Sequence, residues 1–271
     1  MKPGDPAKPT MAESINEVLQ YRDLLYMLTW RDIKARYKQS VMGFFWAILM
    51  PLLILAAGIL VRFAFSVTSG RHINFADLSG IALKSLPWAF FVSALKFGTN
   101  SMVSNPNLVT KIYFPREVLP LAAVLASLFD TSIASPVIIL LLVVGKAGVS
   151  VELLWVPVIL ALIVLFTVTL AMLLSCANLF FRDVKYLVDV ALTFGIFFTP
   201  VFYDARMLGK WASLLLLNPL GSLLEALSDT VIRHQAPALP WLGYAAGWAV
   251  LGLLAAWWVF DQAEASFAES I

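Results

Sequence analysis

The side chains best suited to bind an anion stand immediately before the first long apolar run of the sequence. Residues 30–40, WRDIKARYKQS, contain a cluster of bases and a tyrosine: Arg31, Lys34, Arg36, Tyr37 and Lys38. Lys and Arg side chains donate charge-assisted hydrogen bonds to phosphate oxygens. Two interpretations stay open from the residues alone. The bases anchor the chain to a lipid surface, or they also bind an anionic ligand or a cytoplasmic partner.

Two ionisable residues, Lys96 and Asp130, lie inside stretches that are otherwise apolar. An ionisable group at bilayer depth is costly and is therefore a candidate for function. Counted along helices from the nearest loops, the two lie at similar depths of about 14 and 20 Å. We therefore expect a Lys96–Asp130 ion pair between neighbouring helices. The alternative is that Asp130 only makes hydrogen bonds within the bundle, beside Thr131 and Ser132.

The sequence lacks the common motifs of nucleotide-binding and catalytic sites. A P-loop is absent, because the Gly-Lys pairs at 145–146 and 209–210 are followed by Ala147 and Trp211 rather than Ser or Thr. It also has no His-Glu-x-x-His motif, and Cys176 is its only cysteine. We expect no enzyme activity, no metal site and no cofactor bound by this chain itself.

Composition places the chain in the membrane. Of its 271 residues, 61% are hydrophobic and only 13% are charged, and the mean hydropathy is +0.85. Soluble domains carry about 25% charged residues. The 19 basic residues nearly balance the 17 acidic ones, which argues against a nucleic-acid partner, because such proteins carry a strong basic excess. Membrane lipid is therefore the expected surrounding.

The apolar runs predict an all-α membrane protein with six transmembrane helices. About 20 apolar residues are needed to cross a bilayer as a helix. The expected spans are residues 42–67, 81–103, 118–144, 153–180, 186–203 and 236–260. Between the last two, residues 204–235 are interrupted by charges and prolines, and we expect short re-entrant helices there that form a periplasmic gate.

The N-terminal segment predicts a different kind of element. We expect residues 1–40 to be a cytoplasmic tail with an amphipathic helix at the membrane interface, and residues 41–271 to be the transmembrane domain. Ser14 and Glu17 have the spacing of a capping box, which begins such a helix. Lys and Arg are concentrated in the loops on the side of the N-terminus, which predicts that both termini are cytoplasmic.

Three stretches resemble the signature regions of a known family. They are RDIKARYKQSVMGFFWAILMPL, NPNLVTKIYFPREVLPLAAVLAS and FRDVKYLVDVALTFGIFFTPVFY. These stretches look like those of polysaccharide ABC exporter permeases of the lipopolysaccharide O-antigen type, to which teichoic-acid exporter permeases are related. The resemblance runs in order from about residue 20 to the C-terminus. Met42, where Leu is common, and Lys96 depart from the family pattern.

This resemblance implies a half-transporter in the bacterial inner membrane. Two copies of the chain would form the pore as a homodimer, and two copies of a separate P-loop ATPase would bind ATP and Mg. The substrate would be an undecaprenyl-diphosphate-linked O-antigen glycan. Alternatives are a permease for teichoic acid, capsule, or a small lipid or drug. A membrane glycosyltransferase is disfavoured because the acidic residues are scattered singly.

The resemblance also implies roles for three groups of residues. Coupling to the ATPase falls to the loop that contains Asn105, Leu108, Val109, Lys111, Ile112, Tyr113, Phe114, Pro115, Arg116 and Glu117. Entry of the lipid diphosphate falls to Arg31, Lys34, Arg36, Tyr37, Lys38 and Arg182. The walls of the glycan channel would be formed by Phe44, Phe45, Trp46, Trp88, Phe90, Phe91 and Tyr203. The plainer alternatives are a solvated loop for the first group and interfacial aromatic belts for the third.

Overall fold

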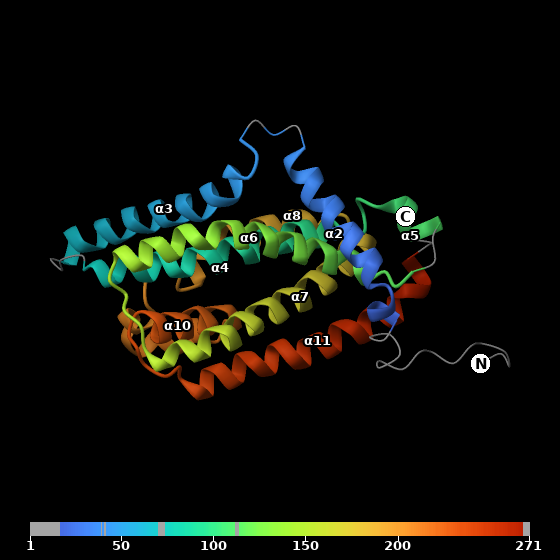
Figure 1. The fold of residues 1–271 in the computed structure, drawn as a ribbon. Coiled ribbons are helices and arrows are strands. Elements are labelled where there is room, and N and C mark those ends of the chain that lie inside the picture. The colour runs from blue at the N-terminus through green and yellow to red at the C-terminus, as the bar shows by residue number, and fades with distance from the viewer. Residues whose placement is uncertain (1–16, 39, 41, 70–73, 112–113, 268–271) are drawn as a thin grey trace.

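The computed structural model describes residues 17–38, 40, 42–69, 74–111 and 114–267, and the regular elements in these residues are all helices. In chain order they are α2 (Arg22–Tyr37), α3 (Phe45–Ser69), α4 (Phe75–Asn100), α5 (Pro106–Lys111), α6 (Val118–Val144), the 3₁₀-helix η1 (Val151–Trp155), α7 (Val156–Phe180), α8 (Val184–Phe198), the 3₁₀-helix η2 (Ala205–Trp211), α9 (Ala212–Leu216), α10 (Pro219–Val231) and α11 (Leu239–Phe267). Figure 1 shows the long helices side by side along one axis. The start of α2, the short α5 and the end of α11 lie together at one end (Figure 1).

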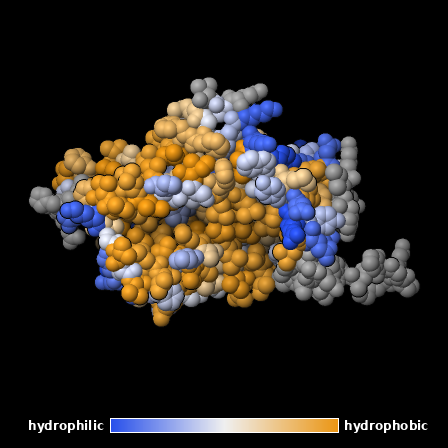
Figure 2. Space-filling view, viewed as in Figure 1, coloured by the Kyte–Doolittle hydropathy of each residue, from blue (hydrophilic) through white to orange (hydrophobic). Residues whose placement is uncertain are grey.

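Five helical stretches are long and apolar enough to cross a membrane: Phe45–Val67, Phe75–Asn100, Val118–Val144, Val151–Phe180 and Leu239–Ala263. They overlap five of the six expected spans. Hydrophobic residues dominate the middle of the face seen in Figure 2, and hydrophilic residues gather toward the ends. The expectation of an all-helical membrane protein is confirmed.

The expected fifth span, residues 186–203, is wrong in its helical extent. Its helix, α8, has 15 residues and ends at Phe198, because Thr199 is extended and precedes Pro200. Two ion pairs nevertheless show how residues 189–204 run beside α4. Asp189 lies beside Lys96, and Asp204 lies beside Lys84. Twelve residues of α4, about 18 Å of helix, separate the two lysines. Residues 189–204 therefore run antiparallel to α4 over that length.

Helix α4 is the centre of the bundle. Within its most apolar stretch 67% is buried, against 17% for that of α3. One face of α4 contributes Trp88, Phe91 and Leu95 to the larger hydrophobic core, which also contains residues of α7, α8, α10 and α11. A second core, with Met102, Phe114 and Phe260, lies at the end where α5 is found. The outer helix α3 is thus the least covered of the five candidate spans.

The segment between α8 and α11 contains short helices, as expected for residues 204–235. Helix α10 begins at Pro219, and the Asn218 side chain caps it by accepting a hydrogen bond from the Leu220 N–H. Every residue from Leu220 to Val231 is buried. A helix that is covered on all sides belongs to a protein core, so α10 is an integral part of the bundle. Its role as a gate remains a proposal.

Helix α2 packs against α6 (Figure 1). It buries Leu28 and Ile33 but leaves Tyr26, Met27 and Trp30 largely exposed. Exposed aromatic and apolar side chains on such a helix suit a membrane interface. The expected capping residue Ser14 lies outside the described residues.

Candidate functional site

A cavity of about 740 Å³ lies among α2, α3, α4, α6 and α8. Its polar lining residues are Arg36, Tyr37, Ser93, Lys96, Asn100, Ser127, Asp130, Thr131 and Asp189, and its aromatic ones are Trp46, Phe90 and Phe97. The sequence positions explain why they meet. Leu86, Phe90, Ser93 and Phe97 recur every three or four residues, which places them on one face of α4. The cavity thus combines charges, hydroxyls and flat aromatic rings.

Arg36 lines this cavity and is held in place by several groups of α6 and α4. Its guanidinium lies 2.6 Å from the Asp130 carboxylate and donates hydrogen bonds to the Ser127 hydroxyl and the Ala123 carbonyl. The guanidinium also lies 3.8 Å from the centre of the Phe97 ring, in the range of a cation–π contact. Its charge is therefore compensated within the protein.

Tyr37 makes a second contact from α2 to the same carboxylate, because its hydroxyl donates to the other Asp130 oxygen. Burial and the hydrogen bond to Asp130 raise the pKa of the Tyr37 hydroxyl above its ordinary value. The neutral, donating form of the tyrosine is thus favoured. Two consecutive side chains of α2 share one acidic partner on α6.

The expected Lys96–Asp130 ion pair is wrong. Lys96 lies 3.1 Å from Asp189 of α8, and Asp130 is occupied by Arg36. The similar depths of the two residues were not enough to predict an ion pair, because depth along a helix does not determine the direction in which a side chain points. Both residues nevertheless line the cavity. The Lys96–Asp189 pair is half exposed there, at 46% and 53% of the two side chains.

The seven expected channel aromatics do not form one surface. Trp46 and Phe90 line the cavity, whereas Trp88 and Phe91 line an apolar groove elsewhere on α4. Phe91 also stacks with Phe166 of α7 at 6.2 Å. The remaining three line neither space: Phe44 packs on Tyr37, Phe45 is exposed, and the Tyr203 hydroxyl donates to the Phe197 carbonyl.

The expected phosphate-binding residues are also divided. Of these six, only Arg36 and Tyr37 line the cavity. Arg31 pairs with the adjacent Asp32, and Lys34 lies 5.4 Å from the centre of the Trp30 ring. Lys38 and Arg182 are exposed. The uncompensated positive charges therefore lie outside the cavity rather than in it.

The expected coupling loop is partly a core element. Val109, Phe114, Pro115 and Glu117 are buried. Arg116 donates to the Val109 carbonyl, Asn105 donates to the Ser101 carbonyl, and Leu108 is half buried. Ile112, Tyr113 and the Lys111 side chain lie outside the described residues. Sequence reasoning missed the exposed positions of α5, Asn107 and Thr110, because which face of so short a helix is covered depends on tertiary packing.

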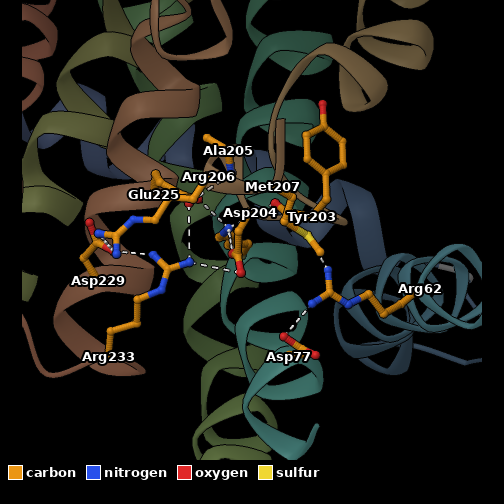
Figure 3. Close-up of polar contacts among 11 residues, drawn as sticks. Arg62, Asp77, Tyr203, Asp204, Ala205, Arg206, Met207, Glu225, Asp229 and Arg233 are labelled. Atoms are coloured by element: carbon orange, nitrogen blue, oxygen red, sulfur yellow. Dashed lines mark hydrogen bonds and ion pairs between the residues drawn. The ribbon is translucent and has the colours of Figure 1, made fainter. Parts of the chain in front are cut away.

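A second polar cluster, the outer charge network, was missed altogether. We define it as Lys84, Asp204, Arg206, Glu225, Asp229 and Arg233. Lys84 of α4 is 1% exposed and lies 2.9 Å from Asp204 and 2.7 Å from Glu225 of α10. Figure 3 shows Arg206 and Arg233 both beside the Asp229 carboxylate. Arg233 also forms ion pairs with Asp204 and Glu225. One feature of the sequence could have indicated this network. Lys84 is a lysine inside an apolar run, and acidic residues occur in the region of short helices far along the chain.

The electrostatics of the outer charge network follow from its geometry. Burial raises the pKa of the Asp204 carboxyl, but the positive charges of Lys84, Arg233 and Arg62 outweigh it and hold that pKa below its ordinary value. For Arg233, burial lowers the pKa of the guanidinium, and the carboxylates of Asp204, Asp229 and Glu225 reverse the shift. Three cations therefore face three carboxylates, and the network joins α4, the loop before η2 and α10.

Known proteins resemble this chain in sequence over most of its length. The family model described as "ABC-2 type transporter" matches residues 23–232. An O-antigen export system permease protein, RfbA, from Myxococcus xanthus is 32% identical over 266 residues, which is 96% of this chain and 100% of the relative. An O-antigen export system permease protein RfbA from Klebsiella pneumoniae is 32% identical over 220 residues, covering 79% of this chain and 83% of the relative. A second RfbA from the same organism is 30% identical over 210 residues.

Proposed function

The chain belongs to the ABC-2 type transporter family, and we propose on this basis that it is the membrane permease of an ATP-driven exporter of O-antigen polysaccharide. It is a component of a transporter rather than an enzyme. The single observation that supports O-antigen as the substrate is the 32% identity with an O-antigen export permease over the whole of that relative. This favours O-antigen over teichoic acid, capsule or a small lipid as the substrate.

The cavity is the proposed place of substrate contact. A glycan needs hydrogen-bonding groups beside flat apolar surfaces, and aromatic rings provide such surfaces. Trp46 and Phe90 stand in the cavity together with Ser93, Thr131 and Asn100. The half-exposed Lys96–Asp189 pair adds charge without a net excess of either sign. A wall of this kind contacts sugars without binding one of them tightly.

Undecaprenyl diphosphate is the proposed carrier of the glycan, and its diphosphate needs free cations. Lys38, just beyond α2, is exposed and is the preferred candidate. Arg36 and Tyr37 have a different proposed role. They fix the last turn of α2 against α6, beside the route that the diphosphate takes. Arg31 and Lys34 contribute to attraction at the membrane surface.

The partner that hydrolyses ATP is proposed to dock on α5. Its exposed residues Asn107 and Thr110 stand over a buried layer of Val109 and Phe114. A rigid helix on a packed base transmits force better than a solvated loop. The side of the membrane on which α5 lies would be the cytoplasm, together with both chain ends.

A homodimer is the proposed form of the pore. Large apolar side chains of α3, among them Leu53, Leu60 and Phe63, are exposed. Phe194 and Phe197 of α8 are exposed as well. Two such surfaces from two copies would close the open side of the cavity, and the segment of η2, α9 and α10 would form the gate at the far end.

Genetic complementation tests the proposed function. A bacterial strain that lacks its own O-antigen export permease should regain surface O-antigen when this chain is expressed together with its cognate ATPase. The same chain with an ATPase whose P-loop Lys is replaced should accumulate the lipid-linked glycan inside the cell. Export that proceeds equally well without the chain, or accumulation of a different lipid-linked product, would contradict the proposal.

A further inference from the structure

An apolar groove of about 570 Å³ lies among α4, α7, α8 and the start of α10. Its walls include Trp88, Phe91, Leu174, Val188 and Leu192, and Thr199 and Asn218 are the polar residues that line it. The groove shares no lining residue with the cavity described above. Helix α4 contributes Trp88, Phe91 and Leu95, which follow the spacing i, i+3, i+7. They lie on a different face of α4 from the residues that line the cavity.

We propose that this groove binds one hydrocarbon chain of an anionic phospholipid whose phosphate is held at Arg182 and Lys185. A space with so few polar groups does not hold ordered water, because a buried water needs about three hydrogen bonds. Left empty, its lining would lose dispersion contacts. Between two helices of a membrane bundle, the available filler is lipid hydrocarbon.

The length of the groove suits one extended hydrocarbon chain. Helix α8 lines the groove from Val184 to Thr199 and spans about 22 Å. The hydrocarbon region of one bilayer leaflet is about 15 Å thick. An extended acyl chain is thin enough to enter lengthwise.

Charge at one end identifies the headgroup. The groove ends between Ala177 and Val184, at the turn that carries Arg182 and Lys185. Neither cation forms an ion pair with any residue that the structure describes, although Lys185 lies over the Tyr186 ring. The intervening Asp183 is exposed and also unpaired within the described chain, which leaves a net positive charge. This is the arrangement that a lipid phosphate requires.

The separation from the cavity favours a phospholipid over the glycan carrier. A carrier bound in the groove would have to place its sugars beside a wall with almost no hydroxyls or charges. The inference therefore goes beyond the proposed function and does not depend on it. The bound phospholipid would fill the space between α7 and α8 and support the position of α8, whose other side contributes Asp189 to the cavity.

Photo-crosslinking tests the proposal. The purified chain with its ATPase is placed in phosphatidylcholine vesicles that contain a minor fraction of phosphatidylglycerol with a diazirine on one acyl chain. After illumination, labelled peptides should map to Leu174 and Val188. Ala191→Trp fills the groove and should abolish this label, whereas Val190→Trp, on an exposed position that does not line the groove, should retain it. If Ala191→Trp fails to fold, Gly195→Leu is the second filler, since a Cβ there meets only Trp88 at 3.5 Å.

Headgroup recognition is tested in the same vesicles. Replacing both Arg182 and Lys185 by Gln should lower the preference for phosphatidylglycerol over an equivalent phosphatidylcholine probe by about 30-fold. Lys146→Gln, in an exposed loop, is the control and should leave the preference unchanged. Equal labelling of wild type and the filled variants would overturn the proposal. So would displacement of the probe by undecaprenyl phosphate but not by phosphatidylglycerol, or crosslinking of Leu187→Cys between two copies with no lipid label.

Discussion

The guanidinium of Arg36 lies 2.6 Å from the carboxylate of Asp130 and ties the last turn of α2 to the middle of α6. Only 11% and 17% of the two side chains are exposed. Tyr37 donates to the same carboxylate. Helix α2 is therefore attached to the bundle by a shielded charge pair that lines the cavity proposed to contact the substrate.

Replacing Asp130 by Asn should destabilise the protein, because it leaves the Arg36 charge shielded and uncompensated. The expected loss in the free energy of unfolding is about 3 kcal/mol. Unfolding by SDS in mixed micelles measures it. Asp183→Asn, at an exposed position, is the matched control and should change the value by less than about 0.5 kcal/mol. Equal effects of the two variants would show that the Arg36–Asp130 ion pair does not stabilise the protein.

The Lys96–Asp189 pair should matter to export more than to stability. Because the pair is half exposed, its contribution to folding is about 1 kcal/mol or less. Lys96→Asp places two like charges together in the cavity and should reduce export of the glycan. The exchange Lys96→Asp with Asp189→Lys should restore export.

The informative control for this exchange is Lys96→Asp with Asp130→Lys. That variant should not restore export, because Asp130 pairs with Arg36. Surface O-antigen in complemented cells is the measurement. Rescue by the Asp130 exchange, and none by the Asp189 exchange, would reverse the assignment of partners.

Lys84 should be among the most sensitive positions of the chain. Its replacement by Met leaves Asp204 and Glu225 without their nearest cation, which costs about 3–5 kcal/mol for a buried pair. We also expect α10 to detach from α4, seen as faster proteolysis in residues 204–218. Lys146→Met, in an exposed loop, should behave as the wild type. Unchanged proteolysis in Lys84→Met would show that α10 is held by its apolar contacts alone.

The exposed positions of α5 should control binding of the ATPase. Placing carboxylates there, as Asn107→Asp with Thr110→Asp, buries unpaired charge in the proposed interface and should weaken the complex by about 1–3 kcal/mol, at least fivefold. Co-purification and the affinity for the isolated ATPase measure this. Val149→Asp, 91% exposed at the other end of the bundle, is the control.

Phe114→Ala provides a contrast to the α5 variant. This side chain is 4% exposed and part of the second core, so its truncation should lower stability by about 3–5 kcal/mol. A chain that stays folded should still bind the ATPase. Full binding by the Asn107/Thr110 variant would place the docking surface elsewhere.

Hydropathy was sufficient to predict five of the spans, because a bilayer imposes a length and an apolar composition on each helix separately. It failed at α8, where Thr199 and Pro200 end the helix although the composition stays apolar. Partners of the charged residues could not be predicted from the sequence. Lys96 and Asp130 lie at similar depths, but the direction of each side chain depends on how the helices pack.

The outer charge network could not be foreseen for the same reason. Lys84 and Glu225 are 141 residues apart, and nothing local in either stretch indicates the other. The buried side of α5 could not be predicted from the sequence either. Val109 and Phe114 could equally be apolar residues of an exposed binding loop, and only the structure shows that they belong to the second core. Local composition identified which residues were unusual, and tertiary packing decided their roles.

We propose passage of the glycan along the cavity bounded by α2, α3, α4, α6 and α8. Its most direct test is transport in proteoliposomes that contain this chain, its ATPase and lipid-linked O-antigen, with ATP supplied on the ATPase side and the exported glycan detected by a lectin on the other. Ala47→Trp places an indole in the cavity, whereas Leu140→Trp, at an exposed position of α6 that does not line the cavity, does not. ATP-dependent transport is expected of the wild type and of Leu140→Trp, and transport at the level without ATP is expected of Ala47→Trp. Wild-type transport by a folded, ATPase-bound Ala47→Trp chain would show that the glycan takes another route.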